Sequence, residues 1–227
     1  MATIKLCGMV RRTDLQLASG LGADFVGMIV DFPRSPRSLS VSEAAQLASG
    51  SRLPVVPVLV DPTVEKVAEV VERVRPFAIQ LSGHEPEALV EAVAQGLEVE
   101  IWKTIHLSSS SSVTAKEQAA RVDEYANAGA TRILLDSETR EMPGGTGRSV
   151  DWRLVRRISS LTLAPLVLSG GLKPDNIGEA IRETGLRAVD VSSGIERAPG
   201  IKDPDLMSGF VEGARRAFAS TDEPGGS

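Results

Sequence analysis

Short runs of apolar and β-branched residues alternate with longer amphipathic stretches along the whole 227-residue chain. The runs that predict strands are Thr3–Leu6, Phe25–Val30, Val55–Val60, Ala78–Leu81, Val99–Ile105, Arg132–Leu135, Leu166–Leu168 and Ala188–Val191. The stretches that predict helices are Thr13–Ser19, Ser42–Ala48, Val64–Val74, Glu87–Ala94, Ala115–Asn127, Trp152–Ile158, Asp175–Glu183 and Pro204–Phe218. This alternation is typical of βα units arranged around a parallel sheet.

The number of units decides between a closed barrel and an open sheet. Eight strands and eight helices, beginning with a strand and ending with a helix, predict an α/β fold of the single-domain (β/α)8 TIM barrel type. No shift in composition marks a domain linker, so we expect one barrel over residues 1–219. The serine run 108–112 predicts a loop, and residues 220–227, which include Pro224, Gly225 and Gly226, predict a flexible tail.

Charge and composition exclude several classes of partner. The net charge is -5 and no dense basic run occurs, which argues against nucleic acid or a membrane surface as the main partner. No apolar stretch approaches the roughly 18 residues of a membrane span, and the N-terminus has no long apolar core, so we expect a cytoplasmic protein. With Cys7 as the single cysteine and no zinc-type spacing, neither an intramolecular disulfide nor a structural metal is expected.

Catalytic residues of such a barrel lie where the strands end, in the loops of the C-terminal face. Cys7 follows the first predicted strand and Asp136 follows the sixth. The loop after the second strand contains Arg34 and Arg37, which could bind an anion. Each residue also has an ordinary explanation, since an apolar-flanked cysteine is usually a core residue, an aspartate a turn residue, and a loop arginine a solvated one.

Glycine-rich loops predict a phosphate site beside these residues. Gly170 and Gly171 follow the seventh strand, and Ser192, Ser193 and Gly194 follow the eighth. Glycines let backbone N–H groups approach a phosphate closely, and the last two loops of such barrels often bind one, although paired glycines also serve simply as turns.

A third glycine-rich loop and two histidines complete the candidates. Gly145, within the run 144–147, could add a lid or further N–H donors. Of the two histidines, we expect His84 to lie on the surface and His106 to lie at a strand end with no evident partner.

Taken in order, these pieces resemble the phosphoribosylanthranilate isomerase family over nearly the whole chain. The motifs that carry the resemblance are Lys5–Gly8, Gly22–Asp24 with Gly27, Ser35–Arg37, Gln80–Leu81 with Gly83, Leu135–Asp136, Pro143–Gly147 with Asp151–Trp152, Leu168–Leu172 with Pro174 and Asn176, and Val189–Gly194 with Pro199–Gly200 and Lys202–Asp203. Each piece is weak alone, but their order, spacing and position at strand ends make the combination specific.

The resemblance implies an Amadori rearrangement in tryptophan biosynthesis, from N-(5-phosphoribosyl)anthranilate to 1-(2-carboxyphenylamino)-1-deoxyribulose 5-phosphate. It implies Cys7 as general base, Asp136 as general acid, Arg37 as the group that holds the anthranilate carboxylate, and Asp190 near the ribose hydroxyls. The glycine loops, with Gly145 among them, would bind the phosphate.

The chemistry agrees with these assignments. A carboxylic acid whose pKa is raised in a dry site could protonate the furanose ring oxygen, and a thiolate favoured by helix N-termini or a nearby arginine could remove the C2 proton. Because the substrate nitrogen serves as the electron sink, the resemblance implies no metal and no organic cofactor. The expected partner is a small phosphorylated molecule, and the chain is expected to be a monomer or a homodimer.

Some residues differ from the family pattern, and other functions of such barrels remain as alternatives. The family commonly has histidine at the position of Ser82, and Asp31 and Arg34 lie where relatives often differ. The related isomerase of histidine biosynthesis should have aspartate in place of Cys7, and indoleglycerol phosphate synthase should have lysines at strand ends. A metal-dependent epimerase should have paired histidines, and a catalytically silent phosphate-binding barrel need not retain both Cys7 and Asp136.

Overall fold

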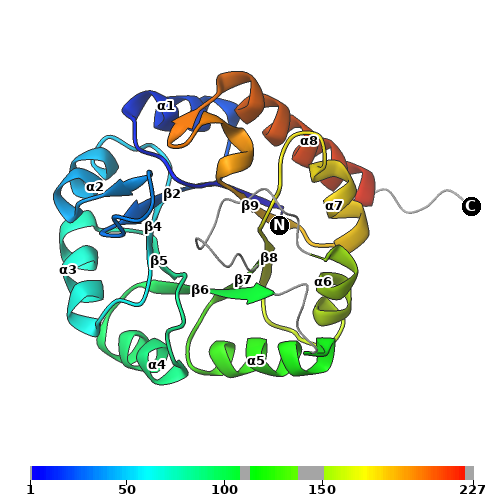
Figure 1. Ribbon diagram of the computed structural model, residues 1–227, viewed down its shortest axis with the longest axis horizontal. Coiled ribbons are helices and arrows are strands. Elements are labelled where there is room, and N and C mark those ends of the chain that lie inside the picture. Colours follow the sequence, from blue (N-terminus) through cyan, green and yellow to red (C-terminus); the bar gives the residue numbers. More distant parts are fainter. Residues whose placement is uncertain (1, 108–112, 138–150, 223–227) are drawn as a thin grey trace, which may run out of the picture.

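The computed structural model describes residues 2–107, 113–137 and 151–222. Within these residues, eight parallel strands form a closed barrel (Figure 1). The barrel strands are β1 (Thr3–Leu6), β2 (Phe25–Val30), β4 (Val55–Leu59), β5 (Ala78–Leu81), β6 (Glu100–Leu107), β7 (Arg132–Ser137), β8 (Leu166–Leu168) and β9 (Ala188–Val191). Strand β1 pairs with both β2 and β9, and these two pairings close the ring.

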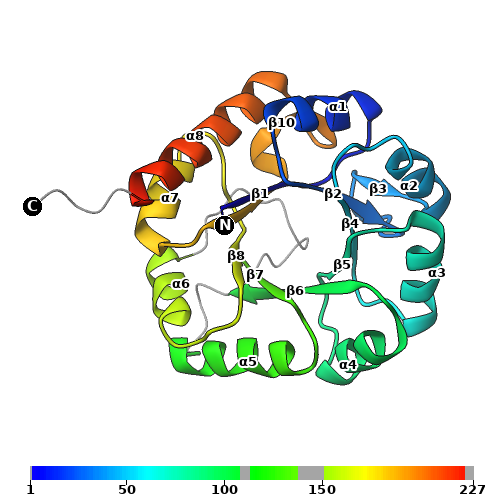
Figure 2. The same cartoon turned by 180° about the vertical axis from the view of Figure 1, so that it is seen from behind.

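A ring of helices surrounds the strands, as Figures 1 and 2 show from opposite faces. The helices are α1 (Arg12–Leu21), α2 (Val41–Ala48), α3 (Val64–Val74), α4 (Glu87–Gly96), α5 (Ala115–Asn127), α6 (Trp152–Ser159), α7 (Ile177–Thr184) and α8 (Pro204–Asp222). Three short strands lie outside the barrel: β3 (Ser38–Leu39) extends the pairing of β2, and β10 (Glu196–Ala198) pairs with β11 (Ile201–Lys202). The predicted fold class is confirmed.

Several boundaries differ from those that the sequence predicts. Strands β6 and β7 each end two residues later than expected, because their parallel ladder continues through the pairs His106–Asp136 and Leu107–Ser137. Helix α2 begins at Val41 rather than Ser42, because Ser40 and Glu43 form a capping box. Helix α8 continues to Asp222, past the expected start of the tail at Ser220.

Strand side chains alternate between the barrel interior and the helix layer, as the period of two residues requires. The interior ends in an apolar layer on the amino-terminal side, formed by Phe25, Val56, Ala78, Trp102, Leu134 and Val167. Two residues further along β5 and β6 the interior becomes polar, with Gln80 and Thr104 buried, and Lys5 on β1 and Asp190 on β9 are buried polar residues as well. The next interior position on β1 is Cys7, so the polar layer lies directly beneath the carboxyl-terminal mouth.

Candidate active site

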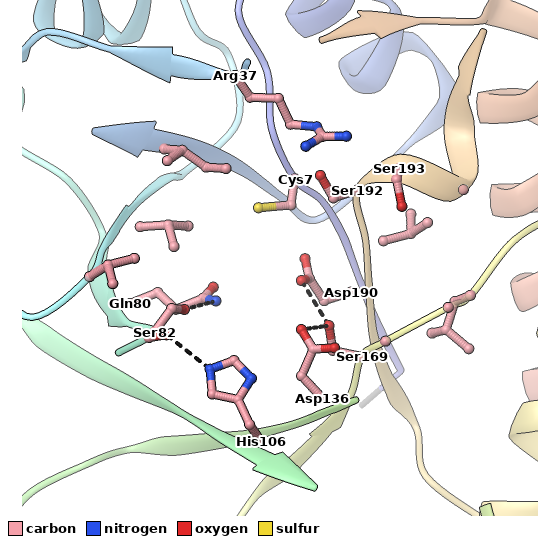
Figure 3. Close-up of a pocket in the computed structure, with 18 of the residues that line it drawn as sticks. Cys7, Arg37, Gln80, Ser82, His106, Asp136, Ser169, Asp190, Ser192 and Ser193 are labelled. Carbon is pink, nitrogen blue, oxygen red and sulfur yellow. Dashed lines mark hydrogen bonds between the residues drawn. The ribbon is translucent and has the colours of Figure 1, made fainter. Parts of the chain in front are cut away.

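One pocket occupies the carboxyl-terminal mouth of the barrel and contains about 730 Å³ of space, counting its open entrance. Its polar lining includes most of the residues that the sequence singles out: Cys7, Arg37, Gln80, Ser82, His106, Asp136, Ser169, Gly170, Gly171, Asp190, Ser192, Ser193 and Gly194 (Figure 3). Ile29, Phe32, Val58 and Val60 provide an apolar wall.

Cys7 is buried directly after β1, where its backbone N–H donates to the Val191 carbonyl at 2.7 Å. Its sulfur lies against Gly27, since a β-carbon at that glycine would be 2.5 Å from Sγ and 3.0 Å from Lys5 Nζ. Burial raises the pKa of the Cys7 thiol, and the nearby Asp190 carboxylate acts in the same direction, while the ammonium groups of Lys5 and Lys202 oppose both. Lysines rather than an arginine therefore provide the favourable charge, and burial outweighs it.

Asp136 is the residue before the last of β7 and points into the same pocket (Figure 3). The Ser137 backbone N–H donates to Oδ1 at 2.7 Å, and the Ser169 hydroxyl donates to Oδ2 at 3.3 Å. Burial raises the pKa of Asp136, and Asp190 raises it further, while His106 and the two hydrogen bonds lower it. The net direction is the one that a general acid requires.

Gly170 makes room for the Asp136 carboxyl. Its φ is +84°, a left-handed conformation that favours glycine, and a β-carbon there would lie 2.6 Å from Asp136 Oδ1 and 2.5 Å from the Ser137 nitrogen. The loop after β8 therefore both lines the pocket and determines where the carboxyl of Asp136 lies.

Asp190 forms a buried ion pair with Lys5 across the β1–β9 pairing, with Nζ 2.8 Å from Oδ1. The hydroxyl of Ser169 lies 3.4 Å from the other carboxylate oxygen. Ser169 thus connects the two aspartates of the pocket, and Asp190 retains a position in the lining.

Arg37 is buried rather than solvated, because it forms a two-pronged ion pair with Glu196. Its Nε and Nη2 atoms lie 2.7 Å and 2.6 Å from the two carboxylate oxygens. Lys202 Nζ contacts the same carboxylate at 2.8 Å and the Ser192 carbonyl at 2.9 Å. The guanidinium is consequently fixed in the pocket wall, whereas Arg34 is exposed and does not line the pocket.

The two glycine loops meet at one side of the pocket. A β-carbon at Gly194 would overlap the Leu172 carbonyl at 1.8 Å, so the loops after β8 and β9 approach one another as closely as glycine permits. Among the described residues, the backbone N–H groups of Gly170 and Gly171 have no hydrogen-bond acceptor. Gly145 lies outside the described residues.

The structure corrects the expectation that His106 has no partner. Its Nε2 lies 2.9 Å from the Ser82 carbonyl oxygen, and its ring lines the pocket. His84 is exposed as expected, with its ring centroid 6.4 Å from that of His106.

Three charged residues of this region were not assigned a role from the sequence: Lys5, Glu196 and Lys202. A signal for Lys5 was present, because it stands two residues before Cys7 on a strand and must therefore face the same interior. No comparable signal marks Glu196 and Lys202, since their contact depends on the turn between β10 and β11.

The described residues contain no cluster of three or more histidine, cysteine, aspartate or glutamate side chains that could bind a metal. Within the same ranges, none of the helices is both long and apolar enough to cross a bilayer.

Relatives and solved structures agree with this geometry. Residues 4–213 match the family model for N-(5'-phosphoribosyl)anthranilate isomerase. A protein of that name from Rhodopseudomonas palustris is 40% identical over 93% of this chain and 95% of its own length. A second, from Erythrobacter litoralis, is 34% identical over 96% of this chain and its entire length.

The fold comparison gives the same result. The crystal structure of phosphoribosyl anthranilate isomerase from Thermotoga maritima superposes with a TM-score of 0.82 at 32% identity, covering 95% of this chain and all of that one. A complex of such an isomerase with reduced 1-(o-carboxyphenylamino)-1-deoxyribulose 5-phosphate gives 0.79 at 30% identity, with the same coverage.

The barrel and its pocket define an α/β-barrel enzyme with titratable side chains and glycine-rich loops gathered at the strand ends. The chain belongs to the N-(5'-phosphoribosyl)anthranilate isomerase family. Membership confirms the predicted enzyme class, an aldose–ketose isomerase, and the predicted reaction in tryptophan biosynthesis.

Proposed function

We propose that Cys7 is the general base and Asp136 the general acid of this isomerase. The observation that supports this assignment is that both side chains line one pocket from different strands, with the pKa of Asp136 raised, the direction in which the carboxyl keeps its proton to higher pH. The same pocket has Arg37 on one side and two glycine loops on another, which suits a substrate with a carboxylate and a phosphate.

Two anchors orient the substrate in this proposal. The phosphate accepts hydrogen bonds from the backbone N–H groups of the loops that contain Gly170, Gly171, Ser192, Ser193 and Gly194, and Gly145 belongs to the same proposed site. Glu196 occupies two of the five N–H donors of Arg37, so the remaining donors can reach the anthranilate carboxylate. Holding both ends fixes the ribose between the acid and the base, which favours reaction by limiting its orientations.

The first chemical step opens the sugar ring. Asp136 donates its proton to the furanose ring oxygen, the bond between C1 and that oxygen breaks, and the lone pair of the anthranilate nitrogen forms a C1=N iminium. The carboxylate that remains is stabilised by the hydrogen bonds from Ser137 and Ser169.

The second step removes the proton from C2. The Cys7 thiolate takes that proton, the C2–H electron pair forms the C1=C2 double bond, and the iminium electrons return to nitrogen. Protonation at C1 and loss of the C2 hydroxyl proton then give the ketone, so the reaction is an isomerisation with no net change in atoms or electrons. Asp190 lies in the lining between the two groups, where we place the ribose hydroxyls.

Kinetics of four variants test the assignment. We expect Asp136→Asn and Cys7→Ala to lower kcat by about 10²–10⁴-fold with little change in affinity for a phosphorylated product analogue. Arg37→Ala should mainly raise KM, whereas Arg34→Ala, an exposed arginine of the same loop, should change neither constant. Near-normal kcat in both acid/base variants would refute the mechanism.

Assembly and location stay predictions. One neighbouring structure is described as monomers generated from the dimeric isomerase of Thermotoga maritima. We expect a monomer or a homodimer in the cytoplasm, which light scattering after size-exclusion chromatography and cell fractionation would test.

A further inference from the structure

His106 is the titratable side chain nearest to Asp136 on the neighbouring strand. The two residues are direct partners in the parallel register of β6 and β7, and both project into the pocket. Side chains at paired positions of neighbouring parallel strands point to the same face and lie one strand spacing apart, about 4.8 Å. The imidazole and the carboxyl are therefore placed to interact.

The Ser82 carbonyl fixes the orientation of the His106 ring. That oxygen can only accept a hydrogen bond, so the ring nitrogen 2.9 Å from it, Nε2, carries a hydrogen. Proton gain and loss must then occur at Nδ1. Figure 3 shows that this second nitrogen faces the side of the pocket on which Asp136 lies.

The acceptor itself is held rigidly. Lys103 Nζ, which is fully buried, donates to the Gly83 carbonyl at 3.0 Å and to the Thr104 carbonyl at 2.8 Å. The hydroxyl of Ser82 is bonded to Thr104 Oγ1 at 2.9 Å. Lys103 Nζ also lies 3.4 Å from the Leu81 carbonyl, so both chain neighbours of Ser82 contact the same ammonium group, and the acceptor of the His106 hydrogen bond is held in place.

We propose that His106 is a positioning residue for Asp136, an imidazole whose protonation state and that of the neighbouring carboxyl control one another. An imidazolium favours the carboxylate form of Asp136, and a carboxylate favours the imidazolium, so the pair shares protons. The attraction from His106 that lowers the pKa of Asp136 is consistent with this geometry. His106 thus limits how strongly the buried site retains the acid's proton.

Among the residues that the structure describes, few other charged groups lie around the pair. Asp190, paired with Lys5, faces Asp136 through the shared Ser169 hydroxyl, and Cys7 lines the pocket beyond it. His84 faces His106 from the loop after β5 at a centroid distance of 6.4 Å. Replacing His106 or Asp136 one at a time therefore separates the interaction between these two side chains from the effects of the surrounding groups.

Nuclear magnetic resonance tests the coupling without any turnover. The chain has two histidines, so the two imidazole Cε1–H signals can be assigned with His106→Gln and followed against pH. In Asp136→Asn we expect the pH dependence of the His106 signal to change, because the partner charge is gone, while that of the His84 signal stays as in the wild type. An unchanged His106 titration in a folded Asp136→Asn protein would overturn the proposal.

A second experiment measures the pH dependence of kcat/KM. It rests on the proposed role of Asp136, and its outcome is independent of the magnetic resonance result. In His106→Gln, the acid limb of kcat/KM should move to higher pH, because the charge that favoured the carboxylate form of Asp136 is removed. His84→Gln is the matched control and should keep the wild-type profile. A uniform loss of rate in His106→Gln with no movement of the limb would show a merely structural role and overturn the proposal. If the magnetic resonance coupling is found but Asp136→Asn keeps its activity, the proposed acid is wrong and the pairing stands.

Discussion

Cys7 lies close to two ammonium groups that are themselves paired with carboxylates. Lys5 is bound to Asp190 and Lys202 to Glu196, each at 2.8 Å. Buried charges are costly unless they are paired, which explains why each lysine has its own acid. The pairing also reduces the net positive charge that Cys7 experiences, so burial prevails and the thiol form is favoured.

The raised pKa values of Cys7 and Asp136, the proposed base and acid, predict how kcat/KM depends on pH. In the proposed mechanism the active form has Asp136 protonated and Cys7 ionised. Because a cysteine ordinarily loses its proton at higher pH than an aspartate, this form is a minor one. Its fraction increases up to the pKa of Asp136, stays constant between the two values, and decreases above the pKa of Cys7. We expect kcat/KM to follow this plateau, with its descending limb above the ordinary cysteine range.

The ultraviolet absorbance of the thiolate supplies an independent check, since Cys7 is the single cysteine and Cys7→Ala gives the blank. Thiolate formation should coincide with the descending limb. A thiolate that forms on the ascending limb would mean that the protonation states are assigned the wrong way round.

Among the structural elements, the loop after β8 determines the position of the Asp136 carboxyl. Gly170→Ala would introduce a β-carbon 2.6 Å from Asp136 Oδ1 in a backbone with positive φ. We expect a loss of stability of about 1 kcal/mol or more and a decrease in kcat of about tenfold or more, because the carboxyl must move.

Gly185→Ala is the matched control for the Gly170 variant. Its φ is +71°, so the backbone strain is similar, but no atom lies within 4 Å of the added carbon. The control should lose a similar amount of stability and keep its kcat. Equal kcat values in both variants would contradict a positioning role for the loop.

The loop between β5 and α4 depends on a buried ion pair. Lys103 and Glu85 are both completely buried, with their charged atoms 2.8 Å apart, and burial lowers the pKa of Lys103. Lys103→Met would leave the Glu85 carboxylate without its countercharge, and we expect the free energy of unfolding to decrease by about 3–5 kcal/mol.

Urea denaturation would measure that loss. Lys66→Met removes an exposed lysine that pairs with Asp31 and Glu69, and it should change the free energy by less than about 1 kcal/mol. Similar values for the two variants would show that the buried pair does not stabilise the loop.

For the molecule as a whole, the alternating pattern was sufficient to predict the barrel, since eight apolar runs with helices between them have few other arrangements. The pattern also placed Cys7, Asp136 and the two glycine loops at one mouth, because all parallel strands end on the same face. The pattern could not predict side-chain contacts between segments that are distant in the sequence. The Arg37–Glu196 pair spans 159 positions, and His106 meets Ser82 across two strands, so neither follows from local spacing.

Turnover by protein treated with a chelator tests the central claim most directly. Purified wild-type protein and Cys7→Ala, both treated with EDTA, would be mixed with freshly generated N-(5'-phosphoribosyl)anthranilate while the decrease in anthranilate-type fluorescence is followed. The account predicts rapid conversion by the wild type and a rate lower by about 10²–10⁴-fold in the variant. Conversion by Cys7→Ala at the wild-type rate, or a wild type that binds the substrate without converting it, would contradict the account.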